Sequence, residues 1–170
     1  ENLREGFDGS DPKDWISVDA TNGKQRMKIQ PWPEEQLEML VGLGQLIIKE
    51  HPHILPEHWH GHHDLCPGYK QDVMGFPFAQ FLQAVYQDDS IEDIWTPFLL
   101  QKDRQQALVD LGYDIGSSGP NGDGVDGDWG RLSDIALREF QVNHDMVENG
   151  QWTTFTCREI WNQLKNLKVG

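Results

Sequence analysis

Histidines are concentrated in one short segment of the chain. Four of them lie within six residues, at His58, His60, His62 and His63. Imidazole and carboxylate groups are preferred zinc ligands, and a catalytic zinc takes three protein ligands while keeping one position for water. A strand over residues 58–64 would place the first three of these histidines on one face and His63 on the other. This spacing indicates a metal site, and the alternative is a surface histidine cluster that holds no metal.

Residues 61–72 contain Gly61-His62-x-Asp64, then Pro67, then Lys70-x-Asp72. This pattern resembles the signature of the zinc-dependent N-acetylmuramoyl-L-alanine amidases, the AmpD-type and phage endolysin amidases. The resemblance implies that His62 and Asp72 are zinc ligands and that Lys70 helps to stabilise an oxyanion. It also implies the reaction, in which zinc-activated water cleaves the amide between N-acetylmuramic acid and the L-Ala of the stem peptide. Val73 departs from the family, which usually has proline there.

The resemblance extends upstream of the histidines. Residues 32–40 look like the family helix that precedes them, and residues 16–19 fall where the family has a strand ending in its catalytic Glu. Asp19 would be a shortened version of that residue, and one methylene less reach would weaken a proton transfer that depends on distance. The alternative for Asp19 is a solvated carboxylate at a strand end.

The family's first zinc histidine lies ahead of its catalytic Glu, but this chain has no histidine before Asp19. We favour an explanation in which an N-terminal part was removed or belongs to a companion chain of the same gene product, since the first residue is Glu1 and no signal peptide opens the chain. Alternatively, His58 or His60 substitutes as a ligand. The last alternative is a metal-free, inactive wall-binding or structural fragment. The expected place of action is the bacterial cell wall, reached from a phage virion or after release.

The second half of the chain resembles the three-helix peptidoglycan-binding domain that is often fused to such hydrolases. The resemblance rests on residues 111–113 (Leu-Gly-Tyr), 126–130 (Asp-Gly-Asp-Trp-Gly), 140–141 (Phe-Gln) and the turn at 149–150. It implies that bacterial peptidoglycan is the partner, with Tyr113, Trp129 and Arg131 as candidate contacts, although each could equally serve packing. The aspartates at 123, 126 and 128 do not fit a calcium loop, because its sixth and twelfth positions are not Gly and Glu. A carboxylate-rich turn is the simpler interpretation.

Hydrophobic periodicity predicts the elements that must position these residues. A strand is expected over residues 15–20, a helix buried on most sides over 34–49, and a second helix over 78–86. Three short helices are expected over 104–111, 133–143 and 156–164, with Ile135 among the buried positions. The predicted fold is an α/β (α+β) amidase portion with a mixed sheet and flanking helices at residues 1–86. A linker at 87–100 and a small all-α three-helix domain at 101–167 follow.

Composition excludes some classes of partner. The formal net charge is −14, which disfavours nucleic acid because phosphate binding depends on clustered Lys and Arg. The longest mainly apolar run, residues 37–48, is too short and too polar to span a bilayer. Cys66 and Cys157 are expected to be free thiols, and we expect Cys66 to be buried rather than bound to a metal.

Overall fold

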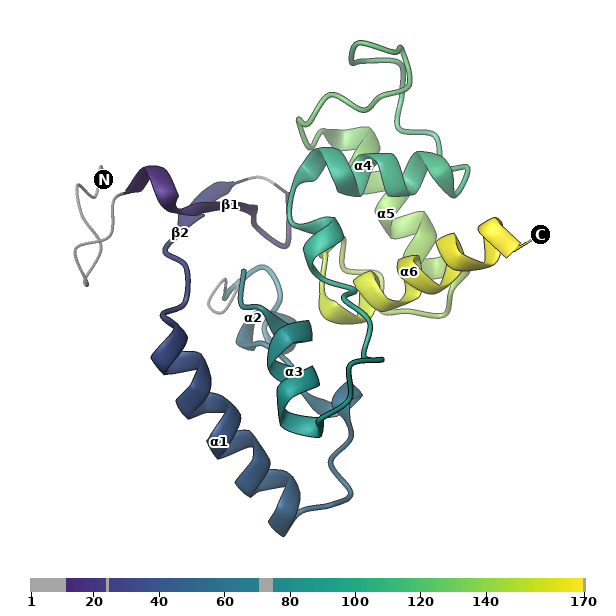
Figure 1. Cartoon of the computed structure of the whole chain (residues 1–170). Helices are drawn as coiled ribbons and strands as arrows, with labels where there is room; N and C mark the ends of the chain where they lie inside the picture. The colour runs from purple at the N-terminus through teal and green to yellow at the C-terminus, as the bar shows by residue number, and fades with distance from the viewer. Residues whose placement is uncertain (1–11, 24, 71–74, 170) are drawn as a thin grey trace.

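The computed structural model describes residues 12–23, 25–70 and 75–169 (Figure 1). Their longer elements are the strands β1 (Ile16–Asp19) and β2 (Arg26–Ile29) and the helices α1 (Glu34–Glu50), α2 (His62–Leu65), α3 (Phe78–Tyr86), α4 (Gln101–Asp110), α5 (Arg131–Asn143) and α6 (Thr154–Val169). Single 3-10 turns lie at Pro12–Asp14, Pro56–His58 and Thr96–Phe98. This is an α+β chain, as predicted at the level of class. Within the described residues, the expected mixed sheet is a two-stranded antiparallel pair.

The chain turns between β1 and β2 at residues 21–23. Ile16 pairs with Ile29 and Asp19 with Arg26, and Gly23 in the turn has a φ of +66°, which is easily reached only by glycine. The sequence did not predict β2. Its four residues, two of them charged and none fully buried, are too few to give a clear alternating pattern.

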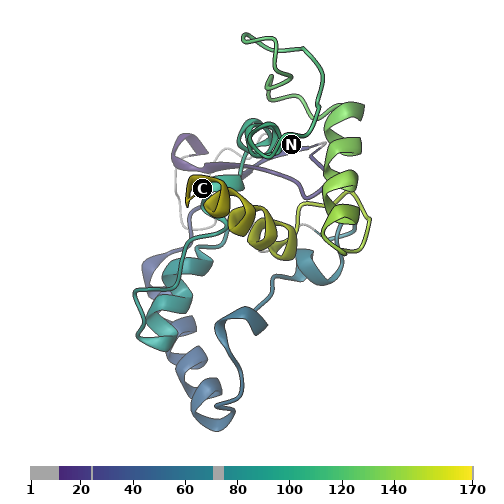
Figure 2. The same ribbon diagram turned by 90° about the vertical axis from the view of Figure 1, so that its right-hand side faces the viewer.

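Helix α1 packs against α3, and the two helices extend away from the rest of the molecule (Figures 1 and 2). The contact is close at Gly44, where an added Cβ would lie 2.6 Å from a methyl group of Val85. The prediction that α1 is buried on most sides is wrong for the described residues. Met39, Leu43 and Leu46 are 76%, 54% and 60% exposed. Their positions fall on one face, opposite the stripe that contacts α3.

Helices α4, α5 and α6 share one hydrophobic core. Leu108, Leu137, Phe140 and Ile160 are completely buried there. All three helices were predicted, and each begins two or three residues earlier than its periodic stripe indicates. The expected burial of Ile135 is wrong, since that side chain is 40% exposed. Its neighbours Ala136, which was also expected to be buried, and Leu137 both lie in the core.

Hydrogen bonds connect the β1–β2 hairpin to the segments that directly precede α4 and α6. Asp19 N–H donates to the carbonyl of Leu99 (2.8 Å), and Trp152 N–H donates to the carbonyl of Thr21 (2.6 Å). The expected linker also contributes to packing, because Ile94 and Phe98 are 7% and 4% exposed. The boundaries at residues 86 and 101 stay predictions, but residues on both sides of them interact directly.

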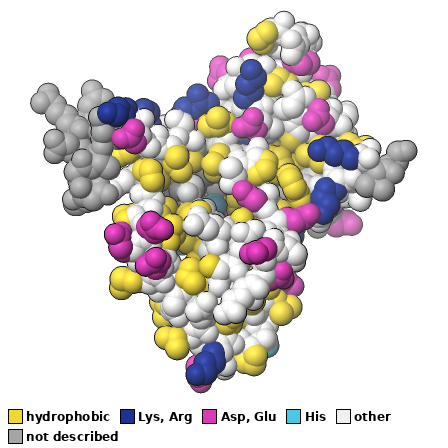
Figure 3. All heavy atoms as spheres, in the orientation of Figure 1, with side chains coloured by type: hydrophobic (Ala, Val, Ile, Leu, Met, Phe, Trp, Pro, Cys, Tyr) yellow, Lys and Arg dark blue, Asp and Glu magenta, His cyan; other side chains and the backbone are white. Residues whose placement is uncertain are grey.

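The surface view shows acidic side chains spread over the face of Figure 1, in keeping with the net charge of −14 (Figure 3). None of the described helices combines the length and the apolar character that crossing a membrane requires, in agreement with the sequence prediction.

Candidate functional site

The histidine segment folds as helical turns. The expected strand over residues 58–64 is wrong: a 3-10 turn ends at His58, and α2 begins at His62. The reason is local, because the carboxylate of Asp64 accepts a hydrogen bond from Gly61 N–H at 2.9 Å and closes the first turn of α2. A helical turn places consecutive residues on different sides. His62 is therefore exposed, while His63 is only 7% exposed.

Asp64 joins this segment to α6. Its side chain is buried, and it accepts hydrogen bonds from Thr154 N–H (2.6 Å) and Thr154 Oγ1 (2.8 Å). Thr154 is the first residue of α6, so the carboxylate satisfies a backbone N–H that has no partner inside the helix. His63 Nε2 lies 3.4 Å from the same carboxylate. The turn that carries His62 is thus fixed to the start of α6 through Asp64.

The two alternative ligands, His58 and His60, are placed differently. His58 Nδ1 accepts a hydrogen bond from Leu55 N–H (3.0 Å), and the side chain is exposed. The His60 ring lies 4.7 Å from the ring of Phe155, and its Nδ1 is buried without a hydrogen-bond partner among the described residues. Burial lowers the pKa of His60 below its ordinary value, against the opposing effect of Asp64.

Lys70 follows the anchored turn. Its backbone N–H donates to the carbonyl of Cys66 (3.0 Å), and its ammonium group lies 5.4 Å from the centre of the Tyr69 ring. Asp72 and Val73 lie outside the described residues. Cys66 is exposed, so the expectation of a buried thiol at this position is wrong, because α2 turns its C-terminal end toward solvent.

The zinc site that the resemblance implies is not complete within the described residues. No group of three or more His, Cys, Asp or Glu side chains among them could hold a metal ion. Of the two ligands predicted by resemblance, only His62 falls in the described range. The fit of zinc to this chain therefore depends on Asp72 and on a further ligand.

Asp19 is completely buried at the end of β1. Its carboxylate accepts hydrogen bonds from Arg26 Nε (2.9 Å), Arg26 Nη2 (3.1 Å) and the backbone N–H of Gln101 (2.6 Å). The hydrogen bond from Arg26 also raises the pKa of that guanidinium. The carboxylate is therefore not solvated, and its lone pairs are engaged within the protein. This geometry favours a structural role, and the proposed catalytic role of Asp19 stays a prediction.

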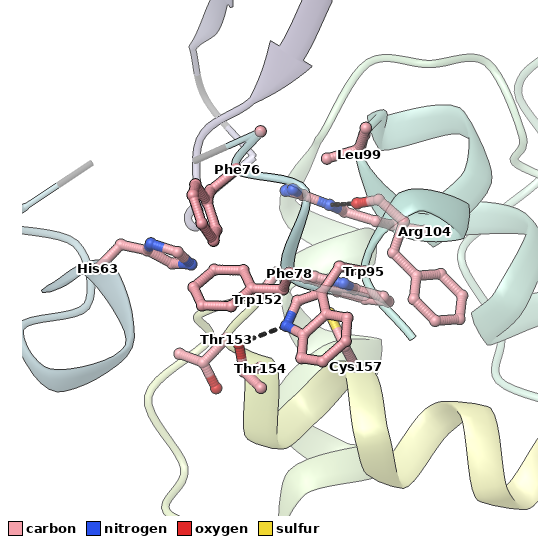
Figure 4. Close-up of a pocket in the computed structure, with 12 residues that line it drawn as sticks. His63, Phe76, Phe78, Trp95, Leu99, Arg104, Trp152, Thr153, Thr154 and Cys157 are labelled. Atoms are coloured by element: carbon pink, nitrogen blue, oxygen red, sulfur yellow. Dashed lines mark hydrogen bonds between the residues drawn. The ribbon is translucent and has the colours of Figure 1, made fainter. Parts of the chain in front are cut away.

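A cavity of about 40 Å³ lies where the two halves meet (Figure 4). His63 and the aromatic rings of Phe78 and Trp95 line it from different elements. Near the start of α6 it is lined by Trp152, Thr153, Thr154 and Cys157. Trp95 Nε1 donates to Thr154 Oγ1 at 2.9 Å, one of the bonds drawn as dashed lines in Figure 4. This volume suits ordered water rather than a substrate.

Arg104 borders this cavity and is 2% exposed. Its guanidinium donates to the carbonyls of Phe98 (2.8 Å), Ala20 (2.7 Å) and Asp19 (2.8 Å). Burial lowers its pKa to about 10, so the group remains charged at neutral pH. Nearby, burial raises the pKa of the Cys157 thiol to about 12, which keeps it protonated.

The three predicted peptidoglycan contacts differ in exposure. The Tyr113 ring packs 5.8 Å from Phe140, and Trp129 is only 7% exposed, packing 5.9 Å from Trp152. Arg131 is exposed at the first residue of α5. The burial of Trp129 favours the packing alternative for that residue.

The carboxylate-rich turn before α5 is internally bonded. Hydrogen bonds from Ser118, the backbone of Asp128 and Gln105 lower the pKa of Asp126 to about 2. Asp123 accepts a hydrogen bond from Val125 N–H at 3.1 Å. These bonds give the acidic residues a structural role in the turn, in line with the simpler interpretation of this segment.

Sequence reasoning did not identify Asp64, Thr154 and Arg104 as the residues that hold the site together. Asp64 was noted only as a motif position, and its partner Thr154 lies 90 residues away.

Scans against family models, curated proteins and solved structures give no match to this chain.

Proposed function

We propose that this chain acts on peptidoglycan, as the carboxy-terminal portion of a zinc-dependent N-acetylmuramoyl-L-alanine amidase followed by a wall-binding helical region. The observation that carries the proposal is that residues of the Gly61–Lys70 motif have different roles in the structure. Asp64 is buried and fixes the turn to α6, whereas His62 is exposed on that turn. Interactions that fix the position of a ligand favour metal binding, and Asp64 fixes the turn on which His62 lies.

The proposed cofactor is zinc, with His62 and Asp72 as ligands and a third ligand from a companion N-terminal segment. Bound zinc would supply a polarised amide and an activated water. The described residues do not complete this site, and no catalytic step follows from them alone. What they contribute is the anchored turn and the positive charge of Lys70 near it.

A second candidate is a non-catalytic wall-binding or structural fragment. The specific observation that favours it is Asp19, whose carboxylate is fully buried and bonded to Arg26 and Gln101. A carboxylate held in this way exchanges protons poorly with a substrate, so the catalytic Glu of the family has no accessible counterpart at Asp19.

Zinc content and stem-peptide release separate the two candidates. The natural full-length protein, with any companion chain, is analysed by mass spectrometry for zinc and incubated with purified sacculi. The amidase proposal expects one zinc per molecule, release of stem peptides with a free L-Ala amino terminus, and loss of both in His62→Ala. His53→Ala is the matched control, because His53 is exposed and lies outside the motif. Wall binding without zinc or peptide release would instead support the non-catalytic candidate.

A further inference from the structure

A second hollow is bordered by the 3-10 turn that ends at His58. It is a groove of about 350 Å³ between the 3-10 turn at Pro56–His58, the segment 90–95 and helix α6. The residues that matter for its chemistry are Glu57, Glu92, Trp95, Arg158, Trp161 and Asn162. Its volume falls within the range of small-molecule sites. It shares no residue with the predicted contacts Tyr113, Trp129 and Arg131.

The two tryptophan rings of the groove are held in fixed orientations. Trp95 Nε1 donates to Thr154 Oγ1 (2.9 Å), and Trp161 Nε1 donates to Glu92 (3.1 Å). Glu92 is held in turn by Lys165, whose Nζ lies 2.6 Å from its carboxylate. Behind the rings, Leu82 and Ile94 are 1% and 7% exposed and give the groove an apolar floor. Rings fixed in this way bind a ligand with little loss of side-chain entropy.

The rim of the groove offers polar groups that the rest of the described chain does not use. The side chains of Arg158 and Asn162 line the groove, and no hydrogen bond or ion pair joins either side chain to another described residue. They lie four residues apart on α6, so both face the same side of the helix. Their guanidinium and amide groups can donate hydrogen bonds, and the exposed carboxylate of Glu57 can accept them.

This combination selects for one class of ligand. A pyranose ring has an apolar C–H face that stacks on an indole and an equatorial edge of hydroxyl and acetamido groups that needs hydrogen-bond partners. Two carboxylates beside the groove disfavour a polyanion such as nucleic acid. We propose that the groove binds one or two N-acetylated sugars of a glycan strand. The proposal rests on the wall-directed function proposed above and adds a second point of contact on α6.

The test is a titration of the full chain with the soluble tetrasaccharide of N-acetylglucosamine, followed by tryptophan fluorescence and calorimetry. The double variant Arg158→Ala/Asn162→Ala should weaken binding at least about tenfold, which corresponds to about 1.4 kcal/mol. Trp161→Phe should also weaken binding while retaining an aromatic ring against Phe98. The matched control is Asn166→Ala, an exposed residue one turn further along α6, which should bind as wild type.

A parallel pull-down with purified sacculi separates this inference from the proposed function. If wild type binds sacculi and the double variant binds them equally, the groove is not the glycan site, although the wall-directed function stands. If wild type binds the tetrasaccharide through the groove but not sacculi, the groove stands and the wall-directed function fails. Absence of tetrasaccharide binding by folded wild-type protein overturns the groove proposal.

Discussion

The carboxylate of Asp64 accepts hydrogen bonds from both the backbone N–H and the hydroxyl of Thr154, 90 residues further along the chain. One acidic residue thus closes the turn that carries His62 and also caps the helix α6. The position of the candidate ligand and the stability of the C-terminal core are therefore linked through one side chain.

Replacing Asp64 should test this link. Asp64→Asn removes the charge and one of the acceptor oxygens, which leaves a buried N–H of Gly61 or Thr154 without its partner. We expect the free energy of unfolding to fall by about 1–3 kcal/mol in urea denaturation followed by tryptophan fluorescence. Asp89→Asn, at an exposed position, is the control and should change stability by less than about 0.5 kcal/mol. Equal stability of the two variants would contradict the bracing role.

Replacing Arg104 should lower the free energy of unfolding more than replacing Asp64 does. Arg104→Met keeps much of the side-chain volume but removes the donors to the carbonyls of Phe98, Ala20 and Asp19. Buried acceptors without partners are costly, so we expect a loss of at least about 3 kcal/mol in the same measurement. Lys102→Met, at an exposed position of α4, is the control. A loss below about 1 kcal/mol would show that the three carbonyls find other partners.

The contact between Gly23 and Trp129 can be separated from backbone strain. A Cβ at Gly23 would overlap the ring of Trp129, while a Cβ at Gly122 would meet nothing within 4 Å. The two glycines have similar φ angles of +66° and +71°. Gly122→Ala should therefore cost about 1 kcal/mol for the backbone alone. Gly23→Ala should cost about 1–3 kcal/mol more, because the Trp129 ring must shift. Similar melting temperatures for the two variants would count against this close packing.

The two cysteines should differ in reactivity. Cys66 is exposed, whereas Cys157 is buried and its thiol has a pKa raised to about 12. Because the thiolate is the reactive form, iodoacetamide at pH 8 should label Cys66 in the native protein and leave Cys157 unmodified. Peptide mass spectrometry reads out both sites, and labelling in urea provides the control in which both react. Rapid native labelling of Cys157 would be inconsistent with its position in the core.

The same thiol predicts a pH dependence of stability. Burial raises the folded pKa of Cys157 from 9.0 to about 12, so the folded state keeps a proton that the unfolded state loses. Its contribution to stability is complete below pH 9 and is lost as the pH rises toward 12, at up to about 1.4 kcal/mol per pH unit. Between pH 9 and 12, the free energy of unfolding of Cys157→Ala should therefore fall less steeply with pH than that of Cys66→Ala. Parallel curves for the two variants would rule out Cys157 as the source.

The elements with clear periodicity could be predicted from the sequence, because their apolar spacing reports one face of a helix. This holds for α1, α3 and the helices of the C-terminal core. The same reasoning failed at the histidine segment. Alternating histidines resemble a strand, yet the turn there is set by the hydrogen bond from Gly61 to Asp64 and by the distant Thr154. Burial also escaped prediction wherever it depends on a remote partner, as for Arg104.

The contact of residues 19–21 with α4 and Trp152 bears on whether the C-terminal helices can fold on their own. Carbonyl groups of these hairpin residues accept the bonds of Arg104 and of Trp152 N–H. Buried donors of the C-terminal region are thus satisfied by carbonyl groups of the hairpin. If residues 101–167 were grafted onto an unrelated protein, the buried guanidinium of Arg104 would lose the carbonyl acceptors of Asp19 and Ala20. They are a portable unit only together with the hairpin.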